Sequence, residues 1–306
     1  MKRRDFIGST LKAGLLGGAA ISLGNVPSLF STTLLQDNKY QLAAIKGGEP
    51  DVMFDEAMKA FGGIRNFVKP GQTVVVKPNI GWDVSPERAG NTNPLLINRI
   101  IKHCYDAGAK SVYVFDHTCD NWKKTYSNSG IEQASKDAKA KVVSGDSESY
   151  YQDVTVKQGK RLKKAKVHEL ILESDVFINV PVLKNHSSTD LTIGMKNLMG
   201  VVWDRGYWHQ NDLHQCIADF TAFRKPDLTI VDAYNVMKRN GPRGVSRADI
   251  VTMKSLIVST DIVAADAAAA KLFGKDPSDI GYIKIANDMN IGTMQLDGLS
   301  IYKKIF

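Results

Sequence analysis

The sequence is poor in cysteine: it has three in 306 residues, and no two of them are spaced as Cys-x-x-Cys. Three cysteines give no disulfide framework, and without such a pair neither an iron–sulfur cluster nor a structural zinc site is encoded in this chain. The chain also has no repeat at solenoid spacing and no low-complexity tract. These absences exclude disulfide-stapled and solenoid architectures.

Several catalytic motifs are missing as well. The sequence contains no Gly-x-Ser-x-Gly, no P-loop and no Gly-x-Gly-x-x-Gly after a predicted strand. Lipase-like, nucleotide-hydrolysing and dinucleotide-binding functions therefore lose their main support. His209 and His214 are five residues apart, which places them poorly on one helical face and argues against a zinc-protease pair.

The composition is that of a globular protein, with 43% hydrophobic and 24% charged residues. The net charge is +8, and residues 1–24 supply +3 of it. The remaining basic excess suits an anionic ligand. The aromatic residues are not interleaved with the basic cluster at 157–166, which argues against a nucleic-acid partner.

The N-terminus resembles a twin-arginine export signal. Residues 2–7 (KRRDFI) precede an uncharged, Gly- and Ala-rich segment at 13–24 that is too short for an ordinary membrane-spanning helix. We predict a signal and linker over 1–31 and a single α/β domain over 32–306. The resemblance implies the twin-arginine translocase as partner, a periplasmic or cell-envelope location, and membrane contact only through an uncleaved signal.

Strand and helix patterns alternate through the rest of the chain. Apolar, β-branched runs predict strands at 42–45, 73–76, 111–115, 141–143, 176–180, 228–231 and 255–258. Helical patterns lie between them at 55–66, 94–106, 130–139, 212–223 and 262–273, the last with Asp261 as N-cap and Gly274 beyond its end. This alternation predicts an α/β fold with a mostly parallel twisted sheet and helices on both faces.

Residues 153–167 predict an inserted β-hairpin that turns at 158–160. The hairpin carries a cluster of lysines and one arginine. We interpret this basic cluster as a solvated face.

Residues 176–200 combine a buried strand with crowded polar residues. The strand at 176–180 is apolar and ends at Pro181. Polar residues then run from Lys184 to Asp190, and Lys196 and Asn197 follow among apolar neighbours. This pattern indicates polar chemistry held against a core.

Polar residues follow five of the predicted strands. They are Lys77 and Asn79, Asp116 and His117, Lys184 and His186, Asp232, and Asp261. Because the carboxyl ends of parallel strands lie along one edge of a sheet, where ligands bind, these residues predict a crevice there.

The crevice residues fall into three groups by chemistry. Lysines 77, 184 and 196 are candidate catalytic groups for binding or acid–base work, and burial of the Lys196 stem would lower its pKa. The candidate substrate-binding residues, suited with the lysines to a carboxylate or phosphate, are Asn79, Asn185, Asn197 and Arg243. The candidate ligands of a divalent metal, which can also exchange protons, are Asp116, His117, His186 and Asp232.

Six sequence blocks resemble those of the domain-of-unknown-function family 362. They lie at 74–79 (VVVKPN), 181–186 (PVLKNH), 194–200 (GMKNLMG), 230–233 (IVDA), 241–244 (GPRG) and 261–266 (DIVAAD). The resemblance covers about residues 40 to 275. Many relatives carry a ferredoxin-like module, whose cysteines this chain lacks.

Two classes of function remain open. The first is an exported enzyme that acts on a small anionic substrate, with or without a divalent metal. The second is a non-catalytic cofactor-binding or maturation accessory protein of an envelope redox system. Assembly of many ionisable groups in one crevice favours the enzyme.

Overall fold

The computed structural model describes residues 39–306, which belong to one compact unit. The predicted signal and its boundary between residues 31 and 32 lie outside the described residues. Within 39–306 no helix combines the length and apolar character needed to cross a membrane.

A mixed, mostly parallel sheet forms the centre of the fold, in the order β12-β1-β11-β10-β7-β2-β3-β4. Most neighbouring strands are parallel, and β11 is antiparallel to both of its neighbours. The strands are β1 (Leu42–Lys46), β2 (Thr73–Pro78), β3 (Ser111–Val114), β4 (Lys141–Val142), β5 (Tyr151–Thr155), β6 (Lys164–His168), β7 (Val176–Val180), β8 (Val182–His186), β9 (Asp190–Thr192), β10 (Leu228–Met237), β11 (Ile250–Ser259) and β12 (Ile301–Ile305).

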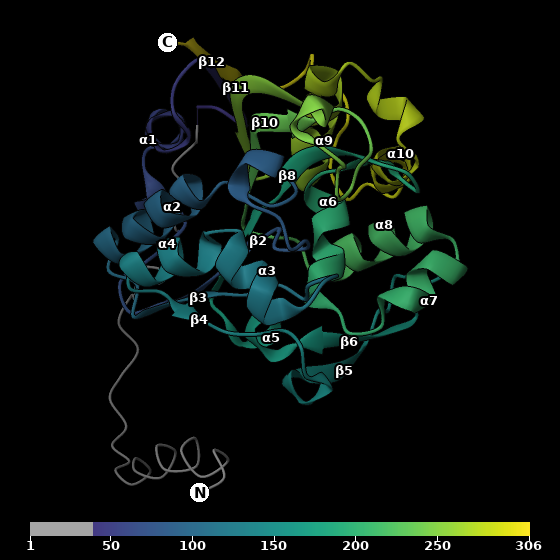
Figure 1. Ribbon diagram of the computed structural model, residues 1–306. Helices are drawn as coiled ribbons and strands as arrows, with labels where there is room; N and C mark the ends of the chain where they lie inside the picture. Colours follow the sequence, from purple (N-terminus) through teal and green to yellow (C-terminus); the bar gives the residue numbers. More distant parts are fainter. Residues whose placement is uncertain (1–38) are drawn as a thin grey trace, which may run out of the picture. The chain divides into compact units, whose positions relative to one another are not determined.

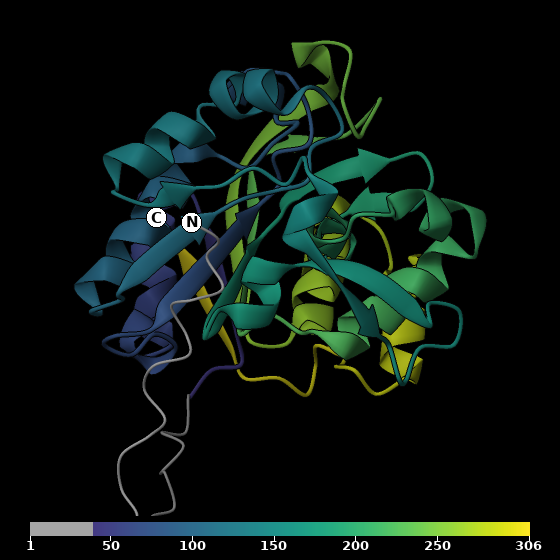
Figure 2. The same ribbon diagram turned by 90° about the horizontal axis from the view of Figure 1, so that it is seen from below.

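Helices cover both faces of this sheet, as predicted (Figures 1 and 2). The helices are α1 (Pro50–Ala60), α2 (Pro94–Asp106), α3 (Trp122–Asn128), α4 (Ile131–Asp137), α5 (Glu169–Glu173), α6 (Gly194–Asn197), α7 (Arg205–Gln210), α8 (Leu213–Phe223), α9 (Ile262–Phe273) and α10 (Gly281–Asp288). Successive side chains of a strand point to opposite faces, so Val74 and Val76 pack with α1 and α2 whereas Val75 packs with α8, α9 and α10.

The strands separate at the point where the site lies. β2 pairs with β7 as far as Pro78 and Val180. Beyond Pro181 the chain continues as β8, which pairs with β10 and with the short β9. β2 is therefore not paired with β8. Asn79, which follows β2, contacts Lys184 of β8 through a hydrogen bond.

The predicted β-hairpin insertion is present. β5 and β6 form a separate two-stranded antiparallel sheet, in which Tyr151 pairs with His168. A single bridge between Val167 and Val202 joins this hairpin to the segment that follows α6. The hairpin is thereby fixed beside the carboxyl ends of the main strands.

Local sequence signals fixed some boundaries and missed others. Asp261 N-caps α9 by accepting from the backbone N–H groups of Val263 (2.8 Å) and Ala264 (3.2 Å), and Gly274 ends the helix with a φ of 93°. The strand expected at 228–231 instead continues to Met237, because β10 pairs with β11 along its length. The helix expected at 55–66 is α1, which begins earlier, at Pro50.

Candidate functional site

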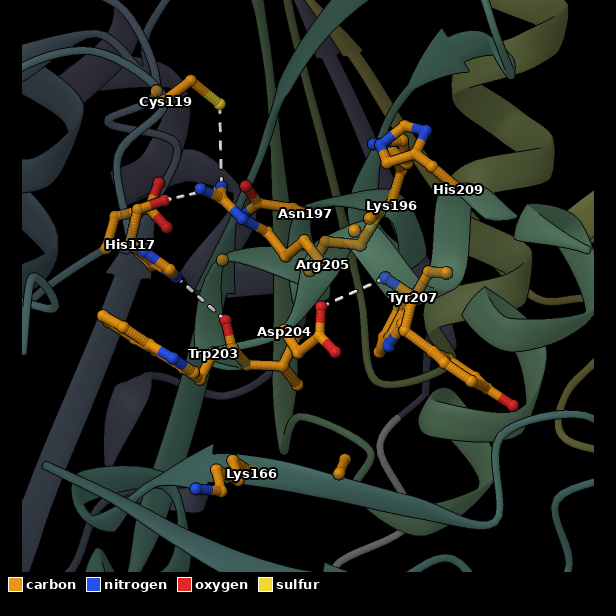
Figure 3. A pocket seen from close by; sticks show the side chains of 18 of the residues that line it. His117, Cys119, Lys166, Lys196, Asn197, Trp203, Asp204, Arg205, Tyr207 and His209 are labelled. Atoms are coloured by element: carbon orange, nitrogen blue, oxygen red, sulfur yellow. Dashed lines mark hydrogen bonds between the residues drawn. The ribbon is translucent and has the colours of Figure 1, made fainter. Parts of the chain in front are cut away.

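A cavity of about 1220 Å³ lies at the carboxyl ends of β2, β3 and β8, between α6, α7 and the hairpin (Figure 3). Eight of the predicted site residues line it: Lys77, Asn79, Asp116, His117, Lys184, His186, Lys196 and Asn197. The structure therefore brings together residues that lie up to 120 positions apart in the sequence.

Lys77 is fully engaged by protein groups. Its Nζ lies 3.0 Å from Oδ1 of Asp116 and donates to the backbone O (2.6 Å) and Oδ1 (2.8 Å) of Asn197. Burial lowers the pKa of Lys77, and the charge of Asp116 opposes that shift. Lys77 therefore uses two of its three donors on Asn197, and its ammonium is paired with the Asp116 carboxylate. Lys77 ties β2 to α6.

Gly200 makes room for this ion pair. A Cβ at Gly200 would lie 1.9 Å from Oδ1 of Asp116 and 2.6 Å from Nζ of Lys77. Oδ2 of Asp116 accepts from the backbone N–H of Ile80 at 2.7 Å. Asp116 is therefore held from both sides, and any side chain at Gly200 would displace it.

Lys184 is buried without a carboxylate partner. Its side chain is 1% exposed, and its Nζ donates to the backbone O of Gly90 (2.6 Å) and to Oδ1 of Asn79 (3.1 Å). The pKa of Lys184 is lowered to about 7, mainly by burial and in smaller part by the charge of Lys196. When Lys184 is protonated, one of its three N–H donors is left over.

Lys196 lies on the cavity wall and donates to no acceptor among residues 39–306. It belongs to α6, where Met195 and the following Leu198 are buried in the core. The pKa of Lys196 is lowered to about 8, mainly by burial and in smaller part by the charge of Arg205. This lysine is therefore the amine most available to a ligand within the cavity's inner wall.

Two histidines of the cavity are held as opposite tautomers. Nδ1 of His117 lies 3.0 Å from the backbone O of Val202, so it donates and leaves the lone pair on Nε2. Nδ1 of His186 accepts from the backbone N–H of Ser188 at 3.0 Å, which places the hydrogen on Nε2. Burial lowers the pKa of both rings, that of His186 to about 3, so both are neutral near pH 7.

Comparison with known proteins adds a family to this geometry. The family model described as Domain of unknown function (DUF362) matches residues 74–271. The chain belongs to this family. A thylakoid-associated protein from Synechocystis sp. is 26% identical over 258 residues, which are 82% of this chain and 76% of that protein.

Two solved structures share the fold of this DUF362 protein. The lactate racemase apoprotein from Thermoanaerobacterium thermosaccharolyticum matches with a TM-score of 0.50 and 13% identity over 80% of this chain and 58% of its own. A Thermotoga maritima protein matches with a TM-score of 0.50 and 12% identity over 74% of this chain and 60% of its own. The chain thus spans about three fifths of the solved structures that it matches. At this identity the likeness shows an α/β fold alone.

The DUF362 chain carries three predicted site residues outside the cavity lining. Asp232 lies in the middle of β10, and its carboxylate accepts from the backbone N–H groups of Asn93 (2.7 Å) and Tyr234 (3.0 Å). Burial raises its pKa to about 6. The prediction that Asp232 ends its strand and faces the crevice is wrong, because the strand continues past it.

Asn185 and Arg243 also lie away from the cavity. Asn185 points to the opposite side of β8 from its lysine neighbour and accepts from the backbone N–H of Gly241 at 3.1 Å. Arg243 is more than half exposed and lies 3.4 Å from Oδ2 of Asp120. Among residues 39–306 no three His, Cys, Asp or Glu side chains are grouped to hold a metal ion, so the four predicted ligands do not form one cluster.

Sequence analysis missed several cavity residues of this DUF362 protein. Arg205 donates from Nη1 to the backbone O of His117 and from Nη2 to that of Thr118, both at 2.8 Å. Figure 3 shows its guanidinium reaching the loop that carries Cys119. Trp203 stacks on His117 with ring centroids 5.0 Å apart. The sequence signal that could have revealed these residues is the run Trp203–Tyr207, which is aromatic and charged and lies in a segment without strand or helix pattern.

The hairpin lysines have a different place from the one predicted. Lys163, Lys164 and Lys166 line the outer part of the cavity instead of forming only a solvated face. Lys166 pairs with Glu148, another lining residue. Lys160, at the turn, is exposed and lies outside the lining.

Proposed function

We propose that this cavity binds a small carboxylate or phosphate anion and that Lys184 and Lys196 contact it. The observation that carries the proposal is two lysines in the cavity lining, Lys184 buried and Lys196 partly buried, without a carboxylate partner among the described residues. Buried charges in proteins are paired, and the one buried carboxylate near them, Asp116, is already paired with Lys77. An anionic ligand would supply the missing charge.

Hydrogen-bond donors around the two lysines suit the same ligand. Protonated Lys184 has one N–H left over and Lys196 has three, and the tautomer of His186 presents Nε2–H. Arg205 adds a further positive charge to the wall. With the anion bound, the pKa of each lysine would rise again, because the charged form is then favoured.

The same wall holds groups suited to proton transfer, so we propose that the anion is a substrate of an acid–base enzyme. Efficient general acids and bases have a pKa near the working pH. The pKa values of Lys184 and Lys196, lowered to about 7 and 8, meet that condition, and Nε2 of His117 has a lone pair. We propose no metal ion for this chemistry.

The test is oxalate binding measured by titration calorimetry. Lys184→Met and Lys196→Met keep the bulk of the stem and remove the charge, so each should weaken binding by about 1.5–3 kcal/mol, the scale of a charged hydrogen bond. Lys160→Met, which removes an exposed charge outside the cavity, is the matched control. Equal losses in all three variants, or no loss in any, would overturn the proposal.

A further inference from the structure

Hydrogen bonding distinguishes the three lysines of the inner cavity wall. Lys77 forms an ion pair with Asp116 and donates two hydrogen bonds to Asn197. Lys184 uses two, on Gly90 and Asn79. Lys196 uses none within the described residues, although it is partly buried in the cavity lining.

We propose that Lys196 is a nucleophilic amine, which forms an imine with an anionic carbonyl compound such as a 2-oxo carboxylate. The inference rests on the proposed function, since the anion site must hold the carboxylate while the amine meets the carbonyl carbon. It goes further by giving one lysine a covalent role and the ligand a second functional group.

The surroundings of Lys196 make its neutral amine easier to reach than that of an exposed lysine. A lysine becomes nucleophilic when it is desolvated or lies beside other cations. Lys196 meets both conditions: burial is the largest cause of its lowered pKa, and Arg205 and Lys77 lower it further. No neighbouring carboxylate holds its proton, because Asp116 is paired with Lys77.

We assign different roles to Lys184 and Lys196 because their contacts differ. Lys184 is fixed by two acceptors, so its remaining N–H has a defined direction and suits a carboxylate oxygen. Lys196 has no such restraint, and its single-turn helix α6 is anchored by buried neighbours. One lysine can hold the anion while the other reacts.

The covalent step balances without an added oxidant or reductant. The Nζ lone pair of neutral Lys196 attacks the carbonyl carbon, a C–N bond forms, and the C=O π pair moves to oxygen, which takes a proton. The nitrogen loses a proton, for which Nε2 of His117 offers a lone pair in the same cavity. The first proton on the oxygen comes from solvent. The hydroxyl then takes the proton held by His117 and leaves as water, while the nitrogen lone pair forms the C=N bond of a protonated imine.

The experiment traps this imine in the full-length protein with glyoxylate and cyanoborohydride, and locates the reduced adduct by peptide mass spectrometry. We expect Lys196 to be labelled about tenfold faster than the exposed Lys160, with oxalate protecting it. The rate should rise with pH as Lys196 loses its proton, whose pKa is about 8. Labelling at Lys184 in place of Lys196, or at the rate of Lys160, would overturn the assignment.

Lys196→Arg separates the imine from anion binding. Arginine keeps the charge and cannot form the adduct, so this variant should still bind oxalate while giving no adduct at position 196. If wild type fails to bind oxalate, the proposed function itself fails. If wild type binds oxalate and Lys196 is labelled no faster than Lys160, only the imine proposal fails.

Discussion

Lys77 illustrates why residue type alone does not assign a role. Sequence analysis grouped it with Lys184 and Lys196 as candidate catalytic groups, because all three are lysines of the predicted crevice. The structure gives Lys77 a partner 39 positions away in Asp116, at 3.0 Å. A buried ion pair is worth little relative to an apolar pair, but the loss of one member is costly. We therefore assign Lys77 and Asp116 a positioning role beneath the site.

Gly200→Ala tests this ion pair. The added Cβ would overlap the positions of the Asp116 carboxylate and the Lys77 ammonium, so the pair must separate. We expect a loss of about 3 kcal/mol in the free energy of unfolding, measured with urea, since a broken buried pair leaves charges uncompensated. Gly206→Ala in the exposed helix α7, where the nearest atom would be 3.5 Å away, is the control and should not destabilise. Equal stability of Gly200→Ala and wild type would contradict the prediction.

The elements were predictable where their signals are local. α2 begins at Pro94 and ends at Asp106 as predicted, and α9 has its cap residues within the segment itself. β7 was recognisable from five consecutive buried residues. The family resemblance was also confirmed by the match over 74–271.

Elements that depend on distant partners were not predictable. β8 and β9 carry polar residues with no strand pattern, and they form because Lys184 pairs with Thr192 across a short turn and β8 pairs with β10. α6 depends on α9: both carboxylate oxygens of Asp266 accept from its first N–H groups, at Gly194 (2.7 Å) and Met195 (2.9 Å). No pattern within α6 could reveal a partner 72 positions away.

Asp266→Ala tests the dependence of α6 on α9. The change leaves two buried N–H groups unpaired, each at a cost of about 1–3 kcal/mol, and frees the turn that carries Lys196. We expect lower thermal stability together with weaker oxalate binding. Asp276→Ala, which removes a cap on an exposed turn, should leave oxalate affinity unchanged. Wild-type affinity in folded Asp266→Ala would show that α9 does not position the site.

At the scale of the whole molecule, the cavity lining comes almost entirely from residues 77–209. β11, α9 and α10, which follow, supply core and support but no lining residue. The fold class was predictable because strand and helix patterns alternate along the chain. The cavity's outer wall was not, because distant segments hold the hairpin: Val202 bridges to Val167, and Asp219 accepts from the backbone N–H groups of Arg161 and Leu162.

We also predict that the whole protein is exported by the twin-arginine route. Arg3 and Arg4 lie outside the described residues, and we propose that the twin-arginine translocase reads them. Replacing both by Lys should retain the protein in the cytoplasm, measured by cell fractionation and immunoblotting. Lys2→Arg is the control, because it changes a neighbouring basic side chain and leaves the arginine pair intact. Unchanged envelope localisation of the double variant would reject the assignment.

The outermost strand of the sheet has a consequence for aggregation. Within residues 39–306, β12 pairs with β1 alone, and it carries the exposed Lys303 and Lys304. Charged edge strands resist pairing with other chains, whereas β1 (LAAIK) is apolar until its last residue. Detachment of β12 would uncover β1 as a bare edge and offer it to a second molecule. The two lysines thus oppose edge-to-edge association of a sheet whose cavity lies several strands away.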